Sequence, residues 1–427
     1  MRILMISTHG YVAADPELGK PDTGGQVVYV LELANRFSRL GSTVDLVTRQ
    51  FEDQPEEDVV NENFKVVRIP FGGKKFIRKE DMHDHLSKFV TNFLADARTK
   101  GKQYDIVYSH YWDAGFAGQK IAEELDIPHI HTPHSLGWWK KNNMGTSMKP
   151  EEMEKNYRFE ERIKKEFFVF QMCNHVIATT EPQTELLIDK YDVLERRISV
   201  VPPGMDEGRF SPVRFEDLKS LRKKYSFKDH DVLVVGRMAK NKGHDLLFES
   251  FPTLKKLVPD ARLFAAIGSD DSEQDKKGVD ELKKLAAKLG IEEDVVWRPY
   301  IPDNELADHY RCGSVFSMSS RYEPFGMVAI EAMACGTPSV VTVHGGLKDV
   351  IDFGSQALFA DPNRPIEYGT MLAIPMLYEN VRKEISIEGA RFARRVFGWT
   401  GIAKRILKIF ESHIQVTTMN IHKNSRF

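Results

Sequence analysis

Short apolar runs alternate with amphipathic stretches along almost the whole chain, and this alternation limits the possible folds more than any other feature. Residues 2–7 form an apolar run typical of a buried strand. Apolar side chains then recur at the spacing of one helix face, at Val27, Val30, Leu31, Ala34 and Phe37. Further strands are predicted at 43–48, 65–69, 106–109, 129–131 and 176–179. Strands separated by helices require crossover connections, so the pattern predicts a parallel sheet.

The pattern is interrupted at 200–211, where two prolines and two glycines fall within twelve residues. A second series follows, with strands predicted at 232–235, 261–267, 295–297, 315–318 and 339–343 and helices at 276–289 and 328–334. We therefore predict an α/β protein of two facing Rossmann-like domains, with its ligand site in the cleft between their carboxyl edges. The expected parts are a first domain at 1–205, a second at 206–397, a C-terminal helix at 398–414 that packs back toward the first domain, and a tail at 415–427.

Composition fits this plan and excludes several functions. A chain of 427 residues suits two domains of about 200 residues each. The 60 Lys and Arg residues nearly balance the 62 Asp and Glu residues, so no broad field favours nucleic acid or an acidic membrane. No apolar run approaches the length of a membrane span. The cysteines, Cys173, Cys312 and Cys335, are odd in number and form no CxxC pair. With no signal-peptide pattern at the start, a cytoplasmic protein is expected.

The loop Gly236-Arg237-Met-Ala-Lys240-Asn-Lys242-Gly243 directly follows a predicted strand. At the carboxyl end of a strand, two flexible cations are placed to hold a diphosphate and to stabilise negative charge on a departing nucleotide. For this loop alone, a solvated basic turn is an equally good interpretation.

A second loop, Ser319-Ser-Arg-Tyr-Glu323-Pro-Phe-Gly326, follows another strand and leads into an apolar helix. Gly326 near the helix start lets a ligand approach unpaired backbone amides, which favour a phosphate or a sugar hydroxyl. Glu323 precedes the helix and Glu331 lies within it, so one carboxylate can reach a sugar and the other a ribose diol. The alternative makes Glu331 a surface helix residue and Glu323 a charge partner of the helix N-terminus. A carboxylate with the apolar neighbours Ile330 and Ala332 fits this alternative poorly.

Together these residues resemble the donor-binding half of the family 4 retaining glycosyltransferases, whose two facing domains form the GT-B fold. The Glu-x7-Glu motif of that family corresponds to Glu323 and Glu331, and its basic pair to Arg237 and Lys242. The resemblance covers nearly the whole chain. It implies that 206–397 bind a nucleotide-sugar donor and 1–205 the acceptor. It further implies that Arg237 and Lys242 hold the diphosphate, that Glu331 holds the ribose, and that the hexose is held by Glu323 with the backbone of Phe325, Gly326 and Met327.

In the first domain, Asp22-Thr-Gly24-Gly25-Gln26 opens the first helix after a long loop. This is not a GxGxxG pattern, so a dinucleotide is not indicated. Paired glycines at a helix N-terminus still form a cradle for an anion or a hydroxyl. The other interpretation is an ordinary capped helix with a glycine turn.

Polar residues also follow other strands of the first domain, in Phe71-Gly-Gly-Lys-Lys75, His110-Tyr111-Trp-Asp113 and His131-Thr-Pro-His134-Ser-Leu-Gly-Trp-Trp-Lys140. We interpret His131 as structural and His134 as functional. Arg158 and Arg162 have i,i+4 spacing on a predicted helical stretch, where they can also pair with nearby glutamates.

These segments are similar to the sucrose-phosphate synthase group within family 4. Longer stretches, such as Asp22-Thr-Gly-Gly-Gln-Val-Val-Tyr-Val-Leu-Glu-Leu-Ala, look closer still to the mannosylfructose-phosphate synthases, which join mannose from GDP-mannose to fructose 6-phosphate. The resemblance implies a phosphorylated acceptor. It assigns acceptor binding to Gly24, Gly25, Gln26, Lys75, Tyr111, Lys140, Arg158 and Arg162, and gives Gly25 a donor contact as well.

The resemblance also implies retention of configuration without a metal or cofactor. The fructose hydroxyl would attack from the face of the leaving group, whose phosphate oxygen accepts the proton. The catalytic residues would be Arg237, Lys242 and Glu323 beside the leaving group and hexose, with His134 and Asp113 orienting the hexose. Without the phosphatase-like extension of some sucrose-phosphate synthases, a separate phosphatase is expected to release the free disaccharide.

Three alternatives remain open. The same chemistry with UDP- or ADP-glucose would give sucrose 6-phosphate. A nucleotide-sugar epimerase on the same fold would need no acceptor. A non-catalytic sugar-nucleotide sensor would bind the donor without turnover, although both glutamates and both cations argue against it.

Overall fold

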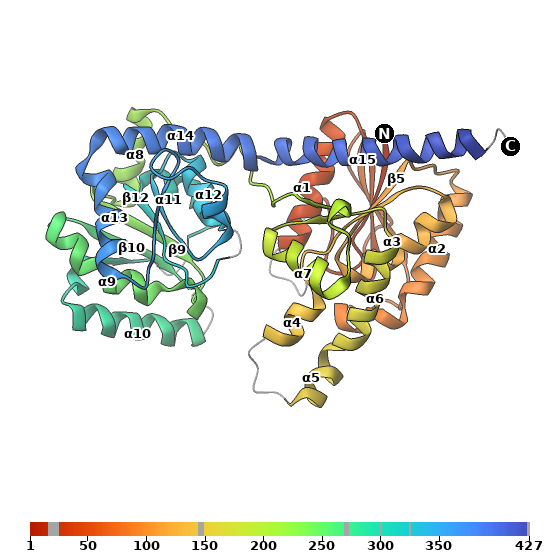
Figure 1. Cartoon of the computed structure of the whole chain (residues 1–427), viewed down its shortest axis with the longest axis horizontal. Helices are drawn as coiled ribbons and strands as arrows, with labels where there is room; N and C mark the ends of the chain where they lie inside the picture. The colour runs from red at the N-terminus through yellow and green to blue at the C-terminus, as the bar shows by residue number, and fades with distance from the viewer. Residues whose placement is uncertain (16–24, 144–148, 269–272, 299–300, 324–325, 425–427) are drawn as a thin grey trace. The chain divides into compact units, whose positions relative to one another are not determined.

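The computed structural model describes residues 1–15, 25–143, 149–268, 273–298, 301–323 and 326–424. The chain forms two compact units (Figure 1): Met1–Pro203 with Trp399–Phe427 is the first, and Gly204–Gly398 is the second. The sequence predicts these transitions at 205/206 and 397/398. In the part of the chain that the structure describes, no helix is long and apolar enough to cross a membrane.

The first unit contains an eight-stranded sheet of order β3-β4-β2-β1-β5-β6-β7-β8, parallel except for the β3–β4 pair. Its strands are β1 (Arg2–Ile6), β2 (Thr43–Gln50), β3 (Glu57–Asn61), β4 (Phe64–Pro70), β5 (Ile106–His110), β6 (His129–Thr132), β7 (His175–Ala178) and β8 (Ile198–Val200). Its helices, with η for 3-10 helices, are α1 (Gly25–Arg39), η1 (Lys79–Asp84), α2 (Leu86–Thr99), α3 (Tyr111–Leu125), α4 (Gly137–Asn143), α5 (Pro150–Tyr157), α6 (Phe159–Met172), α7 (Glu181–Tyr191), η2 (Glu195–Arg197) and α15 (Trp399–Asn424).

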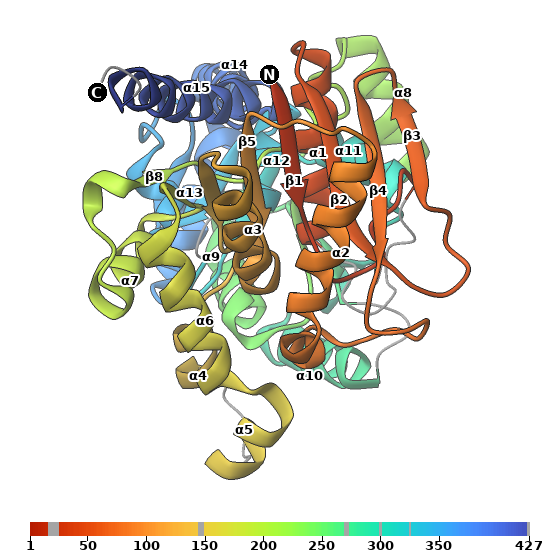
Figure 2. The same ribbon diagram turned by 90° about the vertical axis from the view of Figure 1, so that its right-hand side faces the viewer.

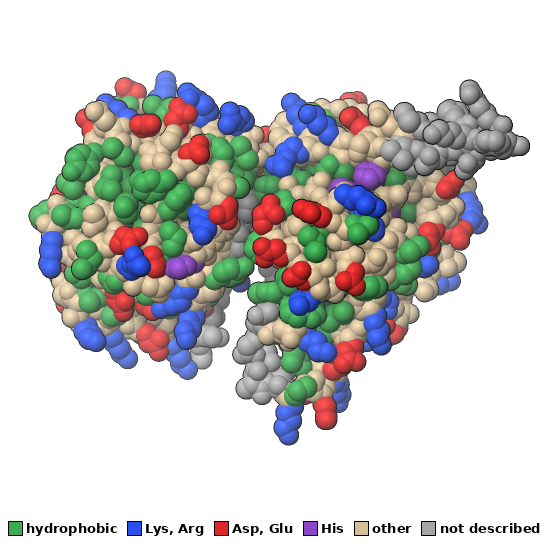
Figure 3. All heavy atoms as spheres, in the orientation of Figure 1, with side chains coloured by type: hydrophobic (Ala, Val, Ile, Leu, Met, Phe, Trp, Pro, Cys, Tyr) green, Lys and Arg blue, Asp and Glu red, His purple; other side chains and the backbone are tan. Residues whose placement is uncertain are grey.

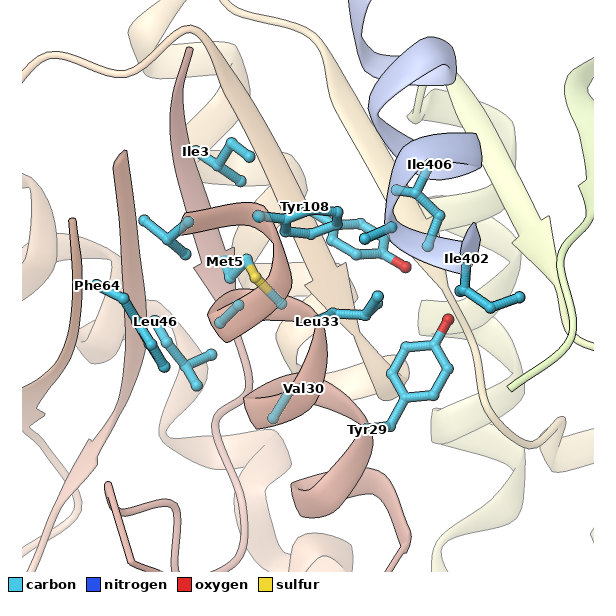
Figure 4. Close-up of a cluster of buried hydrophobic side chains, with 14 of the residues drawn as sticks. Ile3, Met5, Tyr29, Val30, Leu33, Leu46, Phe64, Tyr108, Ile402 and Ile406 are labelled. Atoms are coloured by element: carbon cyan, nitrogen blue, oxygen red, sulfur yellow. The ribbon is translucent and has the colours of Figure 1, made fainter. Parts of the chain in front are cut away.

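Both faces of the first sheet are buried, as the near-continuous apolar β1 predicts. Ile3 and Met5 point to one face, into a core shared with α1 and α15 (Figure 4), while Leu4 and Ile6 point to the other, against α2 and α3. Figure 2 shows α15 lying along the first unit near the N-terminus. Ile406 and its neighbours in α15 are therefore part of the first core.

The second unit contains a fully parallel six-stranded sheet of order β11-β10-β9-β12-β13-β14. Its strands are β9 (Asp231–Gly236), β10 (Arg262–Ile267), β11 (Val295–Trp297), β12 (Val315–Met318), β13 (Ser339–Thr342) and β14 (Leu358–Ala360). Its helices are α8 (Phe215–Tyr225), η3 (Lys240–Lys242), α9 (His244–Leu257), α10 (Glu273–Leu289), η4 (Glu292–Asp294), α11 (Asp303–Cys312), α12 (Met327–Ala334), η5 (Gly346–Asp349), α13 (Pro365–Leu377) and α14 (Glu379–Phe397). The predicted class of two Rossmann-like α/β domains is confirmed.

The two sheets share a feature that determines where a ligand can bind. The first strand of each, β1 or β9, lies inside the sheet, and the chain order reverses beside it: β1 lies between β2 and β5, and β9 between β10 and β12. Loops that leave such neighbouring strands in opposite directions open a crevice at the carboxyl edge. The segments that follow β1, β5, β9 and β12, taken with the first turns of the α-helices after them, contain most of the predicted site residues.

Several elements differ from the sequence-based expectation. Strands β3, β8 and β14 are not predicted. β8 ends at Val200, where the stretch interpreted as a break begins, and its three half-buried residues give no clear pattern. Helix α15 continues past 414 to Asn424, since extending an existing helix is far easier than starting one. On the visible face of each unit, acidic and basic side chains are intermixed (Figure 3), in keeping with the balanced composition.

Candidate active site

Two loops meet at the carboxyl edge of the second sheet, one after β9 and one after β12. Gly243 permits their close approach, because its φ is +60° and a Cβ at this position would lie 2.2 Å from the Ser319 carbonyl oxygen. The Arg321 amide donates to the Asn241 carbonyl at 2.8 Å, and the Ser319 hydroxyl donates to the Gly243 carbonyl at 2.9 Å. The Arg321 guanidinium holds Asp245 through two bonds of 2.7 and 2.6 Å. These contacts hold the two loops together as one rigid segment.

This segment brings Lys242 and Glu323 into contact. Lys242 Nζ lies 2.5 Å from Glu323 Oε2, and the glutamate side chain is only 11% exposed. The Glu323 amide donates to the His344 carbonyl at 3.1 Å, and the adjacent Gly345 approaches so closely that a Cβ there would lie 2.3 Å from the Glu323 carbonyl oxygen. Lys242, predicted to bind a diphosphate, and Glu323, predicted to bind a hexose, therefore lie in direct contact.

Gly326 precedes α12 in a left-handed conformation, with φ +88°. A Cβ at this position would lie 2.8 Å from Met318 Sδ, and the positive φ favours glycine whatever the methionine side chain does. The first amides of α12 have no partners within the helix, and they carry partial positive charge. Met327 is half-buried against the core of the second unit. Phe325, predicted to contact the hexose, lies outside the described residues.

Glu331 lies within α12 and accepts a hydrogen bond from the Tyr310 hydroxyl at 2.9 Å. Burial raises the pKa of Glu331 to about 7, although the hydrogen bond from Tyr310 and the charge of Arg209 act in the opposite direction. A partly buried carboxylate with such a pKa is atypical of a surface helix residue and typical of a ligand-binding group. Tyr310 is a partner that the sequence did not reveal.

Arg237 directly follows β9 and its side chain is exposed. Its carbonyl oxygen accepts a hydrogen bond from Nε2 of the buried His244, 3.0 Å away, which fixes the start of the loop. Arg237 and Lys242 therefore lie on the same loop, as predicted. Whether both contact a diphosphate stays a prediction.

In the first unit, two predicted acceptor cations converge on the Tyr111 hydroxyl. Lys140 Nζ donates to it at 3.1 Å and Arg162 Nη1 at 2.9 Å. The Arg162 guanidinium also lies over the Tyr111 ring, 4.7 Å from its centroid. Tyr111 begins α3 with φ +76°, an unusual conformation for a residue with a side chain. Such strain persists where surrounding contacts impose it, and it is frequent at functional sites.

Arg162 is anchored by Glu166, one helical turn along α6. Its Nε donates to Glu166 Oε1 at 2.7 Å, and its Nη2 donates to the Ser135 carbonyl at 2.8 Å. Glu166 also accepts from the Gly137 amide at 3.0 and 2.9 Å and from the Tyr191 hydroxyl. Glu166 was not singled out from the sequence, but it is one of the nearby glutamates with which Arg162 can pair, and its i,i+4 spacing from Arg162 is the signal that points to it.

A cavity of about 260 Å³ opens beside this cluster. The residues that line it are Lys79, Glu80, His83, Trp112, Lys140, Tyr157, Phe159 and Arg162. In the part of the chain that the structure describes, no carboxylate lies within 4 Å of Lys140 Nζ, whereas Arg162 pairs with Glu166. Among the described residues, Lys140 is therefore a cation of the cavity whose charge no carboxylate balances.

Two further predicted acceptor residues have other surroundings. The spacing predicts that Arg158 and Arg162 share a helix, and this prediction is wrong. Helix α5 ends at Tyr157, and Arg158 adopts φ +48° before α6 begins. Its guanidinium donates to Asp84 at 2.8 and 3.0 Å and to Glu161 at 3.0 and 2.6 Å, in line with the ion-pair alternative. Hydrogen bonds to these carboxylates raise the pKa of Arg158. The Lys75 side chain is exposed, and its carbonyl accepts from Arg49 at 2.8 Å.

At the start of α1, Gly25 is exposed, and a Cβ there would meet no atom of the described residues within 4 Å. Packing against the described residues therefore does not require glycine at this position. Gln26 donates to the Ser7 hydroxyl at the end of β1, at 3.2 Å. Gly24 lies outside the described residues.

The predicted pair His134 and Asp113 occupies two different environments. His134, with φ +56°, lies after β6, and its Nε2 is 3.1 Å from His110 Nδ1. Burial lowers the pKa of His134 to about 3, so the imidazole is neutral. Asp113 is fully buried and accepts from Thr8 at 2.5 Å and from His9 Nδ1 at 2.8 Å. Asp113 thus contacts His9, which sequence reasoning did not select, and a role of Asp113 in orienting the hexose stays a prediction.

Two family models together match most of the chain. Residues 23–209 match Glycosyltransferase Family 4, and residues 218–388 match Glycosyl transferases group 1. Residues 1–44 also match the sucrose synthase first GT-B domain. The fold and these matches define a glycosyltransferase with the GT-B fold, and the chain belongs to glycosyltransferase family 4.

Within this family, the chain is 47% identical to the mannosylfructose-phosphate synthase of Agrobacterium fabrum, over 98% of this chain and 93% of that one. It is 31% identical to a D-inositol 3-phosphate glycosyltransferase of Corynebacterium jeikeium, over 96% of each. The solved structure of sucrose-phosphate synthase from Thermosynechococcus elongatus aligns with a TM-score of 0.71 and 25% identity, over 96% of this chain and 98% of that one.

Proposed function

We propose that this enzyme transfers mannose from GDP-mannose to fructose 6-phosphate with retention of configuration. The observation that carries the proposal is the 47% identity to a mannosylfructose-phosphate synthase, which extends over 98% of the chain. Because the match is not confined to one half, it includes the residues proposed for the donor and those proposed for the acceptor.

The charges of the first unit support a phosphorylated acceptor. Lys140 has the neutral Tyr111 hydroxyl as its described partner, and Arg162 keeps donor capacity beyond its bonds to Glu166 and Ser135. Charge-assisted hydrogen bonds from these cations would favour a phosphate dianion over the hydroxyl of free fructose. Lys75, Gly24, Gly25 and Gln26 remain proposed acceptor contacts, whereas the two ion pairs of Arg158 favour a positioning role for it.

The residues of the second unit support a nucleotide-sugar donor. Arg237 and Lys242 would bind the diphosphate, Glu331 the ribose hydroxyls, and Glu323 with the α12 N-terminus the hexose. In the transfer, the acceptor hydroxyl oxygen bonds to the anomeric carbon while the bond from that carbon to the diphosphate breaks. The hydroxyl proton passes to a phosphate oxygen, and the two cations stabilise the charge that develops on the leaving group.

A second candidate is sucrose 6-phosphate synthesis from UDP- or ADP-glucose. The TM-score of 0.71 to a sucrose-phosphate synthase and the match of residues 1–44 to a sucrose synthase domain favour it. In both candidates the product keeps its phosphate, so a separate phosphatase would release the free disaccharide. The reaction is proposed to be cytoplasmic, consistent with three free, buried cysteines.

The test offers GDP-mannose, UDP-glucose and ADP-glucose separately, each with fructose 6-phosphate, with fructose and without acceptor. The products are identified by mass spectrometry and the anomeric configuration by NMR. A mannosyl-fructose phosphate with retained configuration supports the first candidate, and sucrose 6-phosphate the second. An altered sugar nucleotide without acceptor would indicate an epimerase, and binding without turnover a sensor. The rate is expected to persist in EDTA.

A further inference from the structure

Glu80 lines the cavity of the first unit and is not part of the acceptor set taken from the family resemblance. It lies in η1, and its side chain is 16% exposed. Its Oε1 pairs with Lys79 Nζ at 3.2 Å, and no described residue occupies Oε2. Among the described residues, Glu80 therefore has one carboxylate oxygen without a hydrogen-bond donor.

The cavity is lined by charged groups of both signs, and on η1 these are the ion pair of Lys79 and Glu80. Lys140 and Arg162 converge on Tyr111 and come from α4 and α6, whereas Glu80 comes from η1. A phosphate dianion is attracted to the two cations and repelled by a carboxylate. The hydroxyls of a sugar, in contrast, bind favourably to the Glu80 carboxylate, because each can donate a hydrogen bond to an acceptor oxygen.

Aromatic rings form the remaining walls. Trp112 and Phe159 are nearly buried, and Tyr157 stacks on Phe159 with ring centroids 5.4 Å apart. The negatively polarised faces of such rings attract the C–H groups of a sugar ring. The lining of the cavity thus combines cations, aromatic rings and a carboxylate, which are the groups that bind the phosphate, the C–H groups and the hydroxyls of a sugar phosphate.

The η1 segment is held firmly enough to act as a rigid wall. Asp84 at its end accepts two hydrogen bonds from Arg158, at 2.8 and 3.0 Å. His83 stacks on Trp112 with centroids 4.0 Å apart, and its Nδ1 lies 3.1 Å from Lys165 Nζ. These contacts hold the η1 backbone that carries Glu80, and pre-organisation of this kind lowers the cost of binding.

We infer that Glu80 is a specificity-determining residue that accepts hydrogen bonds from hydroxyls of the acceptor sugar, while Lys140 and Arg162 bind its phosphate. The inference rests on the proposed function, since it concerns the acceptor of that reaction. Two features of the acceptor are then recognised by different residues. The two cations distinguish a phosphorylated sugar from a free sugar, and Glu80 distinguishes sugar phosphates by the arrangement of their hydroxyls.

The test measures acceptor binding by calorimetry in the full-length protein, without donor, so that turnover is not needed. Fructose 6-phosphate is compared with tagatose 6-phosphate, psicose 6-phosphate and 1-deoxyfructose 6-phosphate, which each change one hydroxyl, and with fructose, which lacks the phosphate. Glu80→Gln removes the charge, and Glu80→Asp moves the carboxylate. Asp81→Asn, in the same segment but paired with Arg78 at 2.8 Å, is the matched control.

We expect at least one hydroxyl change to weaken wild-type binding about tenfold or more, and Glu80→Gln and Glu80→Asp to abolish that difference. The preference for fructose 6-phosphate over fructose should persist in both variants, and Asp81→Asn should match the wild type. If the hydroxyl discrimination survives in both Glu80 variants, or if the wild type shows none, the role of Glu80 is refuted and the proposed function stands. If fructose 6-phosphate neither binds nor reacts, the proposed function itself fails, and the role of Glu80 with it.

Discussion

If Glu331 binds the donor ribose as proposed, donor binding should depend on pH near neutrality. The pKa of Glu331 is about 7 because burial disfavours the charged form. One of its oxygens already accepts from Tyr310, 2.9 Å away. Only the ionised carboxylate has acceptor capacity left for both ribose hydroxyls, so the donor should bind the ionised form and release a proton from the protonated form.

The size of the effect follows from the pKa. If only the ionised form binds, the dissociation constant scales with the inverse of the ionised fraction, which is about 0.1 at pH 6 and about 0.9 at pH 8. The affinity should therefore rise about tenfold as the pH increases from 6 to 8. At pH 7 about half a proton should be released per donor bound.

Isothermal titration calorimetry measures both quantities. The ligand is GDP-mannose or UDP-glucose, because an esterified diphosphate does not titrate in this range as a terminal phosphate does. Repeating the titration at pH 7 in buffers of different ionisation enthalpy gives the number of protons released. Glu331→Gln should bind more weakly than the wild type at pH 8 and lose the pH dependence. Tyr310→Phe should move the midpoint above 7, because the hydrogen bond that lowers the Glu331 pKa is lost.

An affinity that does not change between pH 6 and 8, with no proton released at pH 7, would refute the reasoning. A pH dependence that persists unchanged in Glu331→Gln would assign the titration to another group. Either result would remove Glu331 from the proposed ribose site.

Three other substitutions test the two units. Lys242→Ala should lower kcat by roughly 100-fold or more while acceptor binding changes little; equal turnover would exclude its role on the leaving group. Gly243→Ala places a Cβ 2.2 Å from the Ser319 carbonyl and imposes a left-handed conformation on alanine, so it should lower the free energy of unfolding by about 1–3 kcal/mol, as denaturant titration would show. Tyr111→Phe removes the hydroxyl on which two cations converge and should raise KM for fructose 6-phosphate severalfold; a change in kcat alone would argue against acceptor positioning.

Much of the fold can be predicted from the sequence because most strands are buried on both faces. A strand such as β1, apolar throughout, is recognisable without any tertiary information. The strands that escape prediction are β3, β8 and β14, each at an outer position of its sheet. There only part of the strand is buried, so three to five residues leave no distinct hydrophobic pattern.

The candidate site is harder to predict because its contacts join distant parts of the chain. Motif spacing identifies Lys242 and Glu323 separately, but their 2.5 Å contact depends on the close approach at Gly243. Arg158 shows the reverse error: its spacing from Arg162 indicates one helix face, whereas a single left-handed residue separates two helices. Glu80 has no motif around it and becomes visible only once η1 forms a cavity wall.

The division of the chain affects the order in which the protein can fold during synthesis. The second unit is one continuous segment, Gly204–Gly398, whereas the core of the first unit requires Ile402, Ile406 and Phe410 from α15. When the ribosome has completed the first 203 residues, the apolar face of α1 and β5 still lacks this cover. The second unit can therefore complete its core earlier, although its segment is translated later. Until α15 emerges, the nascent first unit exposes apolar surface of the kind that chaperones recognise.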